Sequence, residues 1–232
     1  MNSLELNEER LKKNLESVKE DIKNYSKDPS RVKLVAVTKY FGPDAIEALL
    51  KLGIHNVGEN KGQVMRDKIA YFKEREIGDI KWHFIGNLQK NKVKYIIEDV
   101  ELIHSVNSLS LAQEIDKRAG QIGRTVDILL EINIAGEESK EGYEYEALLE
   151  ELPSYFGLKN VKIKGLMTMA PYIDDENELR SIFRKLRETR DRLNDEFFHG
   201  ELTELSMGMS NDYRIALEEG ATLIRVGTKL YQ

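Results

Sequence analysis

The sequence contains no cysteine, and this absence removes several classes of protein at once. Without thiols there is no disulfide, no Cys-ligated zinc site, no iron–sulfur cluster and no thiol nucleophile. A secreted protein is therefore disfavoured, and we expect a cytoplasmic one. No stretch approaches the roughly 20 apolar residues of a membrane span. The first residues have neither the basic nor the apolar region of a signal peptide.

An excess of positive charge is also absent. The chain has 35 Lys and Arg against 41 Asp and Glu, a formal net charge of −6, which disfavours nucleic-acid binding. The four histidines, at positions 55, 83, 104 and 199, stand singly and without metal-ligand spacing, so no metal site is expected. We interpret His83, near the end of a predicted strand, as a core histidine with satisfied hydrogen bonds rather than a catalyst.

What the sequence does contain is a regular alternation of strand-like and helix-like segments. Apolar residues at helical spacing predict an amphipathic helix over residues 4–26. Strands are predicted near 33–38, 54–58, 81–85, 101–105, 126–133, 162–167, 202–206 and 222–226. Helices between them are predicted near 43–52, 60–74, 88–97, 108–122, 143–151, 176–197 and 211–219.

Strict alternation of this kind predicts an α/β protein with a parallel sheet. Eight strands are the number that closes a (β/α)8 TIM barrel, and 232 residues is near the usual length of that fold. The additional helix precedes the first strand. A doubly wound open sheet is the competing architecture. No linker rich in Pro, Gly or Ser interrupts the pattern, so we predict one domain over residues 1–232.

Each predicted strand is followed by a small or polar residue, and in a barrel these residues meet at the C-terminal face, where reacting groups lie. The residue at the end of the first strand, Lys39, is the most informative of them. Burying an ammonium group is costly unless it is paired or neutralised. The common uses of such a lysine are a Schiff base with a carbonyl compound and a charge clamp on a phosphate.

Small residues follow the last two strands, in the segments Ser206-Met207-Gly208-Met209-Ser210 and Gly227-Thr228. Loops after strands 7 and 8 are the usual phosphate site of a TIM barrel, so we predict phosphate binding there. The alternative is that the glycines only permit tight turns. Arg225 precedes the second loop and is expected to pair with phosphate or a ring nitrogen. Its alternative role is a buried salt bridge with Glu59 or another acid at the rim.

A Schiff-base lysine facing a phosphate-binding loop predicts a phosphorylated aldehyde as the ligand. Pyridoxal 5′-phosphate (PLP) is the common cofactor that combines an aldehyde, a phosphate and a ring nitrogen. A phosphorylated sugar bound by a Schiff-base aldolase is the main alternative.

The order and content of these motifs resemble the pyridoxal phosphate homeostasis protein family, from about residue 30 onward. The matching segments are Val35-Ala36-Val37-Thr38-Lys39, Gly58-Glu59-Asn60, 82–92, Gly165-Leu166-Met167-Thr168-Met169, 205–212 and Ile224-Arg225-Val226-Gly227-Thr228. The resemblance implies a PLP-binding barrel similar to the N-terminal domain of alanine racemase.

The resemblance also implies roles for individual residues. By motif match, Lys39 would carry PLP as an internal aldimine, Arg225 would approach the pyridine nitrogen, and Asn60 would lie by the ring. The phosphate would be held by Ser206, Ser210, Gly227 and Thr228, with backbone help from Met207 and Gly208. Lys140 matches a family lysine implied in handling or transferring the cofactor.

For function, the resemblance implies a carrier that takes part in PLP (vitamin B6) homeostasis and delivers PLP to apo-enzymes, without a turnover reaction of its own. The first alternative is a racemase-like PLP enzyme. Alanine racemases need a second β-domain, and we expect this chain to lack one. The other alternative is a Schiff-base aldolase that does not use PLP. We further expect a monomer, with neither nucleic acid nor membrane as partner.

Overall fold

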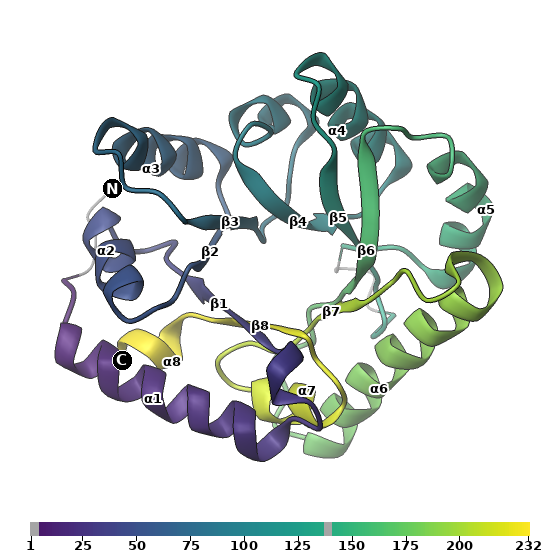
Figure 1. Ribbon diagram of the computed structural model, residues 1–232. Coiled ribbons are helices and arrows are strands. Elements are labelled where there is room, and N and C mark those ends of the chain that lie inside the picture. The colour runs from purple at the N-terminus through teal and green to yellow at the C-terminus, as the bar shows by residue number, and fades with distance from the viewer. Residues whose placement is uncertain (1–4, 137–140) are drawn as a thin grey trace.

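The computed structural model of the protein describes residues 5–136 and 141–232. Its eight parallel strands form a closed barrel in which each strand pairs with the next and β8 pairs with β1 (Figure 1). The strands are β1 (Lys33–Val37), β2 (Asn56–Glu59), β3 (Lys81–Phe84), β4 (Val100–Val106), β5 (Val126–Glu131), β6 (Val161–Met167), β7 (Glu204–Ser206) and β8 (Leu223–Val226). Closure confirms the predicted TIM barrel and rules out the doubly wound open sheet.

Helices surround the barrel, and the predicted helix before the first strand is present (Figure 1). The α-helices are α1 (Glu8–Tyr25), α2 (Pro43–Lys51), α3 (Gly62–Glu74), α4 (Leu109–Gln121), α5 (Tyr145–Tyr155), α6 (Glu176–Leu193), α7 (Tyr213–Glu218) and α8 (Thr228–Tyr231). The other helical turns are η1 (Pro29–Arg31), η2 (Lys90–Tyr95) and η3 (Asn194–Phe198).

Two helix predictions differ from the structure. The α-helix predicted over 88–97 is the short 3-10 segment η2, closed by bonds such as Lys92 N–H to the Gln89 carbonyl at 2.8 Å. The apolar side chains of this segment are buried as predicted, at Leu88, Val93, Ile96 and Ile97, although the backbone is not α-helical. The helix predicted over 176–197 is α6 followed by the π-helical turn η3, which ends at His199 with φ of 49°.

The first helix, α1, is amphipathic because its apolar residues recur at helical spacing, as predicted. Asn7 caps it by accepting the N–H of Arg10 at 2.9 Å, and one face is buried. That face packs beside α7 and α8 (Figure 1). The Asn14 amide donates to the carbonyls of Leu230 at 3.2 Å and Gln232 at 2.9 Å, so α1 holds the last helix in place.

The interior of the barrel contains both an apolar cluster and buried polar side chains. The apolar cluster comprises Val35, Leu102, Leu129, Met167 and Leu223. A larger apolar layer between strands and helices surrounds the barrel. Since alternate strand residues point inward, the same strands also direct buried polar side chains into the barrel. These polar residues include His83, His104, Glu131, Ser206 and Arg225.

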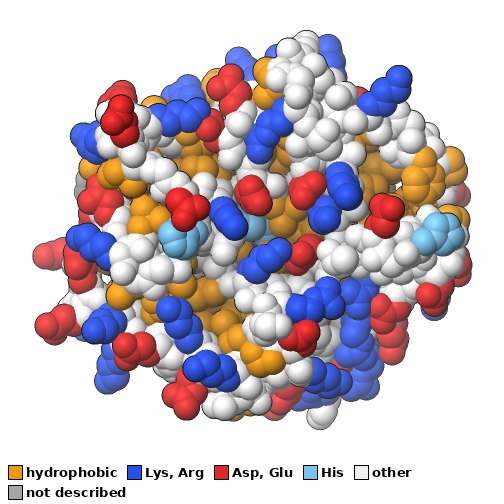
Figure 2. All heavy atoms as spheres, in the orientation of Figure 1, with side chains coloured by type: hydrophobic (Ala, Val, Ile, Leu, Met, Phe, Trp, Pro, Cys, Tyr) orange, Lys and Arg blue, Asp and Glu red, His pale blue; other side chains and the backbone are white. Residues whose placement is uncertain are grey.

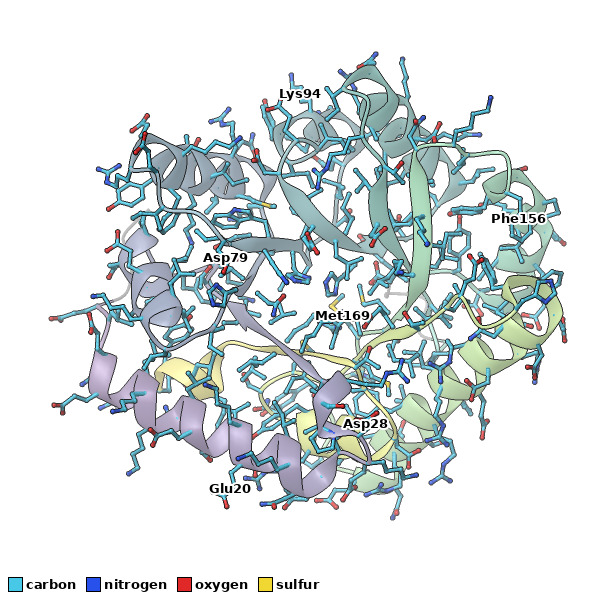
Figure 3. The ribbon with its side chains drawn as sticks, viewed as in Figure 1. Glu20, Asp28, Asp79, Lys94, Phe156 and Met169 are labelled. Carbon is cyan, nitrogen blue, oxygen red and sulfur yellow. The ribbon has the colours of Figure 1, made fainter. Side chains whose placement is uncertain are left out.

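The N-terminal face of the barrel carries charges of both signs. Figure 2 shows Lys, Arg, Asp and Glu side chains intermingled over it, and Figure 3 labels Asp28 and Asp79, which precede β1 and β3. The ion pair of Lys33 with Glu204, at 3.0 Å, is one member of this set. Among the described residues, no helix has the length and apolar content needed to cross a membrane.

Candidate functional site

A pocket of about 1120 Å³ lies at the C-terminal ends of the strands. Loops after six strands form its walls: Lys39, Tyr40 and Phe41 after β1, Asn60 after β2, Ile85 and Gly86 after β3, 169–174 after β6, 209–212 after β7, and Gly227 and Thr228 after β8. Met169 projects near the centre of the barrel in Figure 3. The pocket is therefore at the face where TIM barrels carry their active sites.

Lys39 follows β1 and lines this pocket with a half-buried side chain. Its Nζ lies 5.0 Å from the centroid of the Tyr40 ring. Among the residues that the structure describes, Nζ has no hydrogen-bond acceptor and no acidic partner. An amine without such a partner is available to react with a carbonyl compound, as a Schiff-base lysine must be.

A buried ion pair fixes the backbone next to Lys39. Lys68 Nζ lies 2.5 Å from Glu59 Oε1 and donates to the Thr38 carbonyl at 2.9 Å. The Thr38 hydroxyl donates to the same Glu59 oxygen at 2.5 Å. All three side chains are buried. The residue before Lys39 is thus held at its carbonyl and its hydroxyl, which limits the directions that Lys39 can take.

A close backbone approach positions Asn60. A Cβ on Gly86 would lie 2.7 Å from Asn60 Cα, a distance that real Cβ atoms do not show. Only glycine therefore lets the loop after β3 lie against the loop after β2. This contact turns Asn60 into the pocket wall, beside Gly86 itself.

The loops after β7 and β8 lie against each other, as the sequence predicts. The Ser210 hydroxyl oxygen accepts the N–H groups of Gly227 and Lys229, both at 3.2 Å. Gly208 has φ of 90°, and a Cβ there would lie 2.6 Å from Ala216 Cβ, so the turn requires glycine. Ser210, Gly227 and Thr228 consequently share one wall of the pocket.

Arg225 reaches the pocket from inside the barrel and is almost fully buried. Its NH1 donates to the Ser206 hydroxyl at 2.5 Å and its NH2 to the Thr168 carbonyl at 3.0 Å. Burial lowers the pKa of Arg225 to about 10, while Asp212 and Glu131 act in the opposite direction. The guanidinium therefore stays charged at neutral pH. The salt bridge with Glu59 that we considered from the sequence is wrong, because Glu59 pairs with Lys68.

The predicted site residues fall into three groups. Those that line the pocket are Lys39, Asn60, Ser210, Arg225, Gly227 and Thr228. Those that lie beneath it, fully buried and outside its lining, are Ser206, Met207 and Gly208. Lys140 lies outside the described residues. The predicted phosphate role of Ser206 stays a prediction, and in the structure its hydroxyl accepts from Arg225 and contacts His104.

Sequence reasoning missed the aromatic part of the pocket. Phe41 and Tyr231 stack with ring centroids 4.0 Å apart, and both line the pocket. Tyr40 and Tyr172, which are 59% and 87% exposed, line the pocket from the loops after β1 and β6. The sequence signal for this part of the pocket was the presence of aromatic residues shortly after predicted strand ends.

A second polar cluster lies at the same rim, over β5. The carboxylate of Glu141 accepts amide N–H groups from Asn87 and Asn107. Burial, and then the nearby Glu141, raise the pKa of Glu131 to about 7. None of these four residues lines the pocket, so this cluster is a neighbour of the site rather than part of it.

The residues present fit a ligand that combines an aldehyde, an anionic group and a ring nitrogen. Lys39 supplies an amine without a partner, and Arg225 supplies a fixed cation. The wall made by Ser210, Gly227 and Thr228 supplies hydroxyl and backbone groups of the kind that bind phosphate. Among the described residues there is no cluster of three or more potential metal ligands.

Comparisons with known proteins agree with this geometry. Residues 6–232 match the family described as "Alanine racemase, N-terminal domain". The chain is 42% identical over 223 residues to the "Pyridoxal phosphate homeostasis protein" of Aquifex aeolicus (strain VF5), covering 96% of each chain. It is 39% identical over 203 residues to the protein of that name from Synechocystis, covering 88% of this chain and 92% of the other.

Solved structures give the same result. PipY of Synechococcus elongatus PCC7942, solved with PLP bound, has a TM-score of 0.86 and 35% identity, over 96% of this chain and all of PipY. Alanine racemase of Clostridium difficile 630 has a TM-score of 0.71 and 16% identity, over 97% of this chain and 57% of that enzyme, a likeness of fold alone. The chain belongs to the alanine racemase N-terminal domain family and, within it, to the pyridoxal phosphate homeostasis proteins.

Proposed function

We propose that this chain binds PLP in the pocket at the C-terminal face of the barrel and takes part in PLP homeostasis. The observation that carries the proposal is the position of Lys39, an amine without a partner in a pocket whose other walls include Arg225 and Ser210. The name of the Aquifex aeolicus relative and the PLP bound to PipY support it. Residues 1–232 would act as one PLP-binding domain.

When bound, PLP supplies an aldehyde that condenses with amines and a conjugated ring that stabilises carbanions. Lys39 would hold it covalently as a Schiff base. No carboxylate in the described part of the chain pairs with its Nζ, so the amine is available to react with the aldehyde. The Glu59–Lys68 pair would orient Lys39 by holding the backbone of Thr38. Asn60 would lie beside the ring.

The phosphate would be held by Ser210, Gly227 and Thr228, which share one pocket wall. Gly208 would let the loop after β7 turn tightly enough to reach that wall. Ser206 and Met207 stay beneath the pocket, so a direct contact of Ser206 with phosphate would require its hydroxyl to leave Arg225. The contacts in the structure favour a role for Ser206 beside Arg225.

Arg225 bears on the chemistry because it is a charged donor at the floor of the pocket. A cation near a pyridine nitrogen disfavours protonation of that nitrogen. The ring is then a weaker electron sink, which suits holding the cofactor better than carbanion chemistry. This supports a carrier without turnover, which delivers PLP to apo forms of PLP-dependent enzymes and acts as a monomer. Lys140 would take part in that transfer.

Reconstitution of the purified protein with PLP tests the proposal. We expect an absorbance band near about 420 nm, which is typical of PLP linked to a lysine. Borohydride reduction and peptide mass spectrometry should place the modification on Lys39. Lys39→Ala should abolish the band, whereas Lys61→Ala, which alters an exposed lysine outside the pocket lining, should keep it. A colourless wild-type protein that takes up no PLP would overturn the proposal.

Two further measurements separate the carrier from the alternatives. Mixing the loaded protein with an apo-enzyme, in the presence of a scavenger for free PLP, should restore the activity of that enzyme. Incubation with single enantiomers of amino acids should give no racemisation at enzyme-like rates, for which about 10 s⁻¹ is a median. Racemisation at such a rate would favour the enzyme, and cleavage of phosphorylated sugars without PLP would favour the aldolase.

A further inference from the structure

A chain of hydrogen bonds, buried except at its last residue, runs from the pocket floor through the barrel to Asn56, which opens β2. It starts at Arg225 NH1, which donates to Ser206 Oγ at 2.5 Å. Ser206 Oγ lies 2.7 Å from His104 Nδ1, and His104 Nε2 lies 2.9 Å from His83 Nδ1. His83 Nε2 then lies 3.1 Å from Asn56 Oδ1.

Both histidines in this chain are neutral at physiological pH. Burial, together with Lys33 and Lys81, lowers the pKa of His83 to about 3. Burial, His83 and Arg225 lower the pKa of His104 well below its usual value. Each ring therefore has one N–H donor and one bare nitrogen acceptor.

The direction of the bonds follows from two facts: the guanidinium of Arg225 can only donate, and each buried hydroxyl and ring hydrogen needs an acceptor. Ser206 Oγ accepts from Arg225, and its hydroxyl hydrogen then goes to His104 Nδ1. His104 must carry its proton on Nε2 and donate to His83 Nδ1. His83 likewise carries its proton on Nε2 and donates to Asn56 Oδ1.

The reverse direction is less satisfactory. His104 Nδ1–H and Arg225 would both donate to Ser206 Oγ, and the Ser206 hydroxyl hydrogen would have no acceptor in this chain of bonds. Ser206 and His104 are fully buried, so a donor without an acceptor there is unfavourable. In the first direction every member of the chain is satisfied.

We propose that His104 and His83 are positioning residues for the cofactor site, because they hold the Ser206 oxygen as an acceptor that fixes the guanidinium of Arg225 at the pocket floor. This inference rests on the proposed PLP function. In this arrangement Ser206 acts on the cofactor site by orienting Arg225. Without His104, the Ser206 hydroxyl is free to rotate, and Arg225 loses the fixed acceptor opposite the one at Thr168.

The ligand-free wild-type protein offers a test that needs neither a variant nor PLP. Long-range ¹⁵N–¹H NMR reports which nitrogen of each histidine carries the proton. We expect Nε2–H for both His83 and His104, with neither ring titrating between pH 8 and 5. An Nδ1–H form of either buried ring would overturn the inference.

The PLP-loaded protein provides the second test. His104→Leu removes the acceptor for the Ser206 hydroxyl, and Ser206→Ala removes the acceptor for Arg225. Both should raise the dissociation constant for PLP about tenfold and shift the pH at which the cofactor band changes. His104→Gln, whose amide can replace one hydrogen bond, should recover part of both effects. The control His199→Asn should match the wild type.

The outcomes separate this inference from the proposed function. Absence of PLP binding by the wild type contradicts the proposed function. Normal wild-type binding with an unchanged affinity and pH profile in folded His104→Leu and Ser206→Ala contradicts the inference. If His104→Leu fails to fold, the NMR assignment and the Ser206→Ala comparison decide the matter.

Discussion

The ammonium group of Lys68 lies 2.5 Å from Oε1 of Glu59 in the interior of the protein. The side chains are 7% and 0% exposed, so water does little to screen either charge. The second carboxylate oxygen, Glu59 Oε2, has no hydrogen-bond partner. The carboxylate therefore depends on Lys68 to offset the cost of its burial. The pair is also hydrogen-bonded to Thr38, the residue that precedes Lys39.

Lys68→Met should lower the free energy of unfolding by about 3–5 kcal/mol, because it leaves Glu59 buried without its partner. Adding Glu59→Gln should recover much of that loss. Lys73→Met is a matched control on the same helix, since its exposed pair with Asp99 contributes only about 0–1 kcal/mol. Urea unfolding measures all three variants. Equal effects of the two lysine substitutions would contradict the buried-pair argument.

Gly208→Ala should be strongly destabilising. A residue with a side chain is strained at φ of 90°, and its Cβ would meet Ala216 Cβ at 2.6 Å. Together the two effects correspond to about 2–4 kcal/mol. Gly78→Ala is the control, because no atom lies within 4 Å of a Cβ there and no positive φ is involved. Thermal unfolding compares the two variants. Similar melting temperatures would contradict the requirement for glycine at position 208.

Glu131 should make the protein less stable as the pH rises. Its pKa is raised from 4.5 to about 7, first by burial and then by Glu141. The folded state therefore binds the proton more tightly than the unfolded state. That stability is fully present below pH 4.5 and is lost as the pH rises through about 7. At about 1.4 kcal/mol per unit, the loss is roughly 3 kcal/mol at most.

Glu131→Gln, which mimics the protonated acid, should flatten this pH dependence. We expect its urea midpoint to change less than that of the wild type between pH 5 and 8. Glu150→Gln alters an exposed glutamate and should follow the wild-type curve. Parallel curves for Glu131→Gln and the wild type would show that Glu131 is ionised in the folded protein.

Ser210→Ala should weaken PLP binding about tenfold while preserving the linkage to Lys39. The substitution removes the oxygen that joins the loops after β7 and β8 through Gly227 and Lys229. A tenfold change corresponds to about 1.4 kcal/mol, which is typical of one or two hydrogen bonds. Absorbance titration with PLP measures it, with Ser110→Ala at an exposed helix position as the control. An unchanged affinity would exclude Ser210 from the phosphate site.

Strand periodicity predicted the barrel because each strand is short, apolar and followed by a small or polar residue. Lys39 and Thr228 could be placed at one rim for the same reason, since closure brings the carboxyl ends of all strands together. The prediction over 88–97 was wrong in helix type. Val93, Ile96 and Ile97 are buried, as their helical spacing suggests, yet the backbone at 90–95 forms the 3-10 segment η2.

The contacts beneath the pocket could not be predicted in the same way. His83 and His104 come from neighbouring strands, and their bond depends on the register of β3 with β4, which shifts between Trp82 and His83. The Glu59–Lys68 pair depends on how α3 packs on the barrel. A signal for Lys68 was present, because it falls within the buried stripe of Met65, Ile69 and Phe72 on that helix.

The amide of Asn14 joins the first helix to the last one, and the last helix carries Tyr231, which lines the pocket. Two helices more than 200 residues apart in sequence are thus joined next to the pocket wall. A change in α1, on the outside of the barrel, is therefore expected to reach the pocket wall at Tyr231 without altering a residue of that wall.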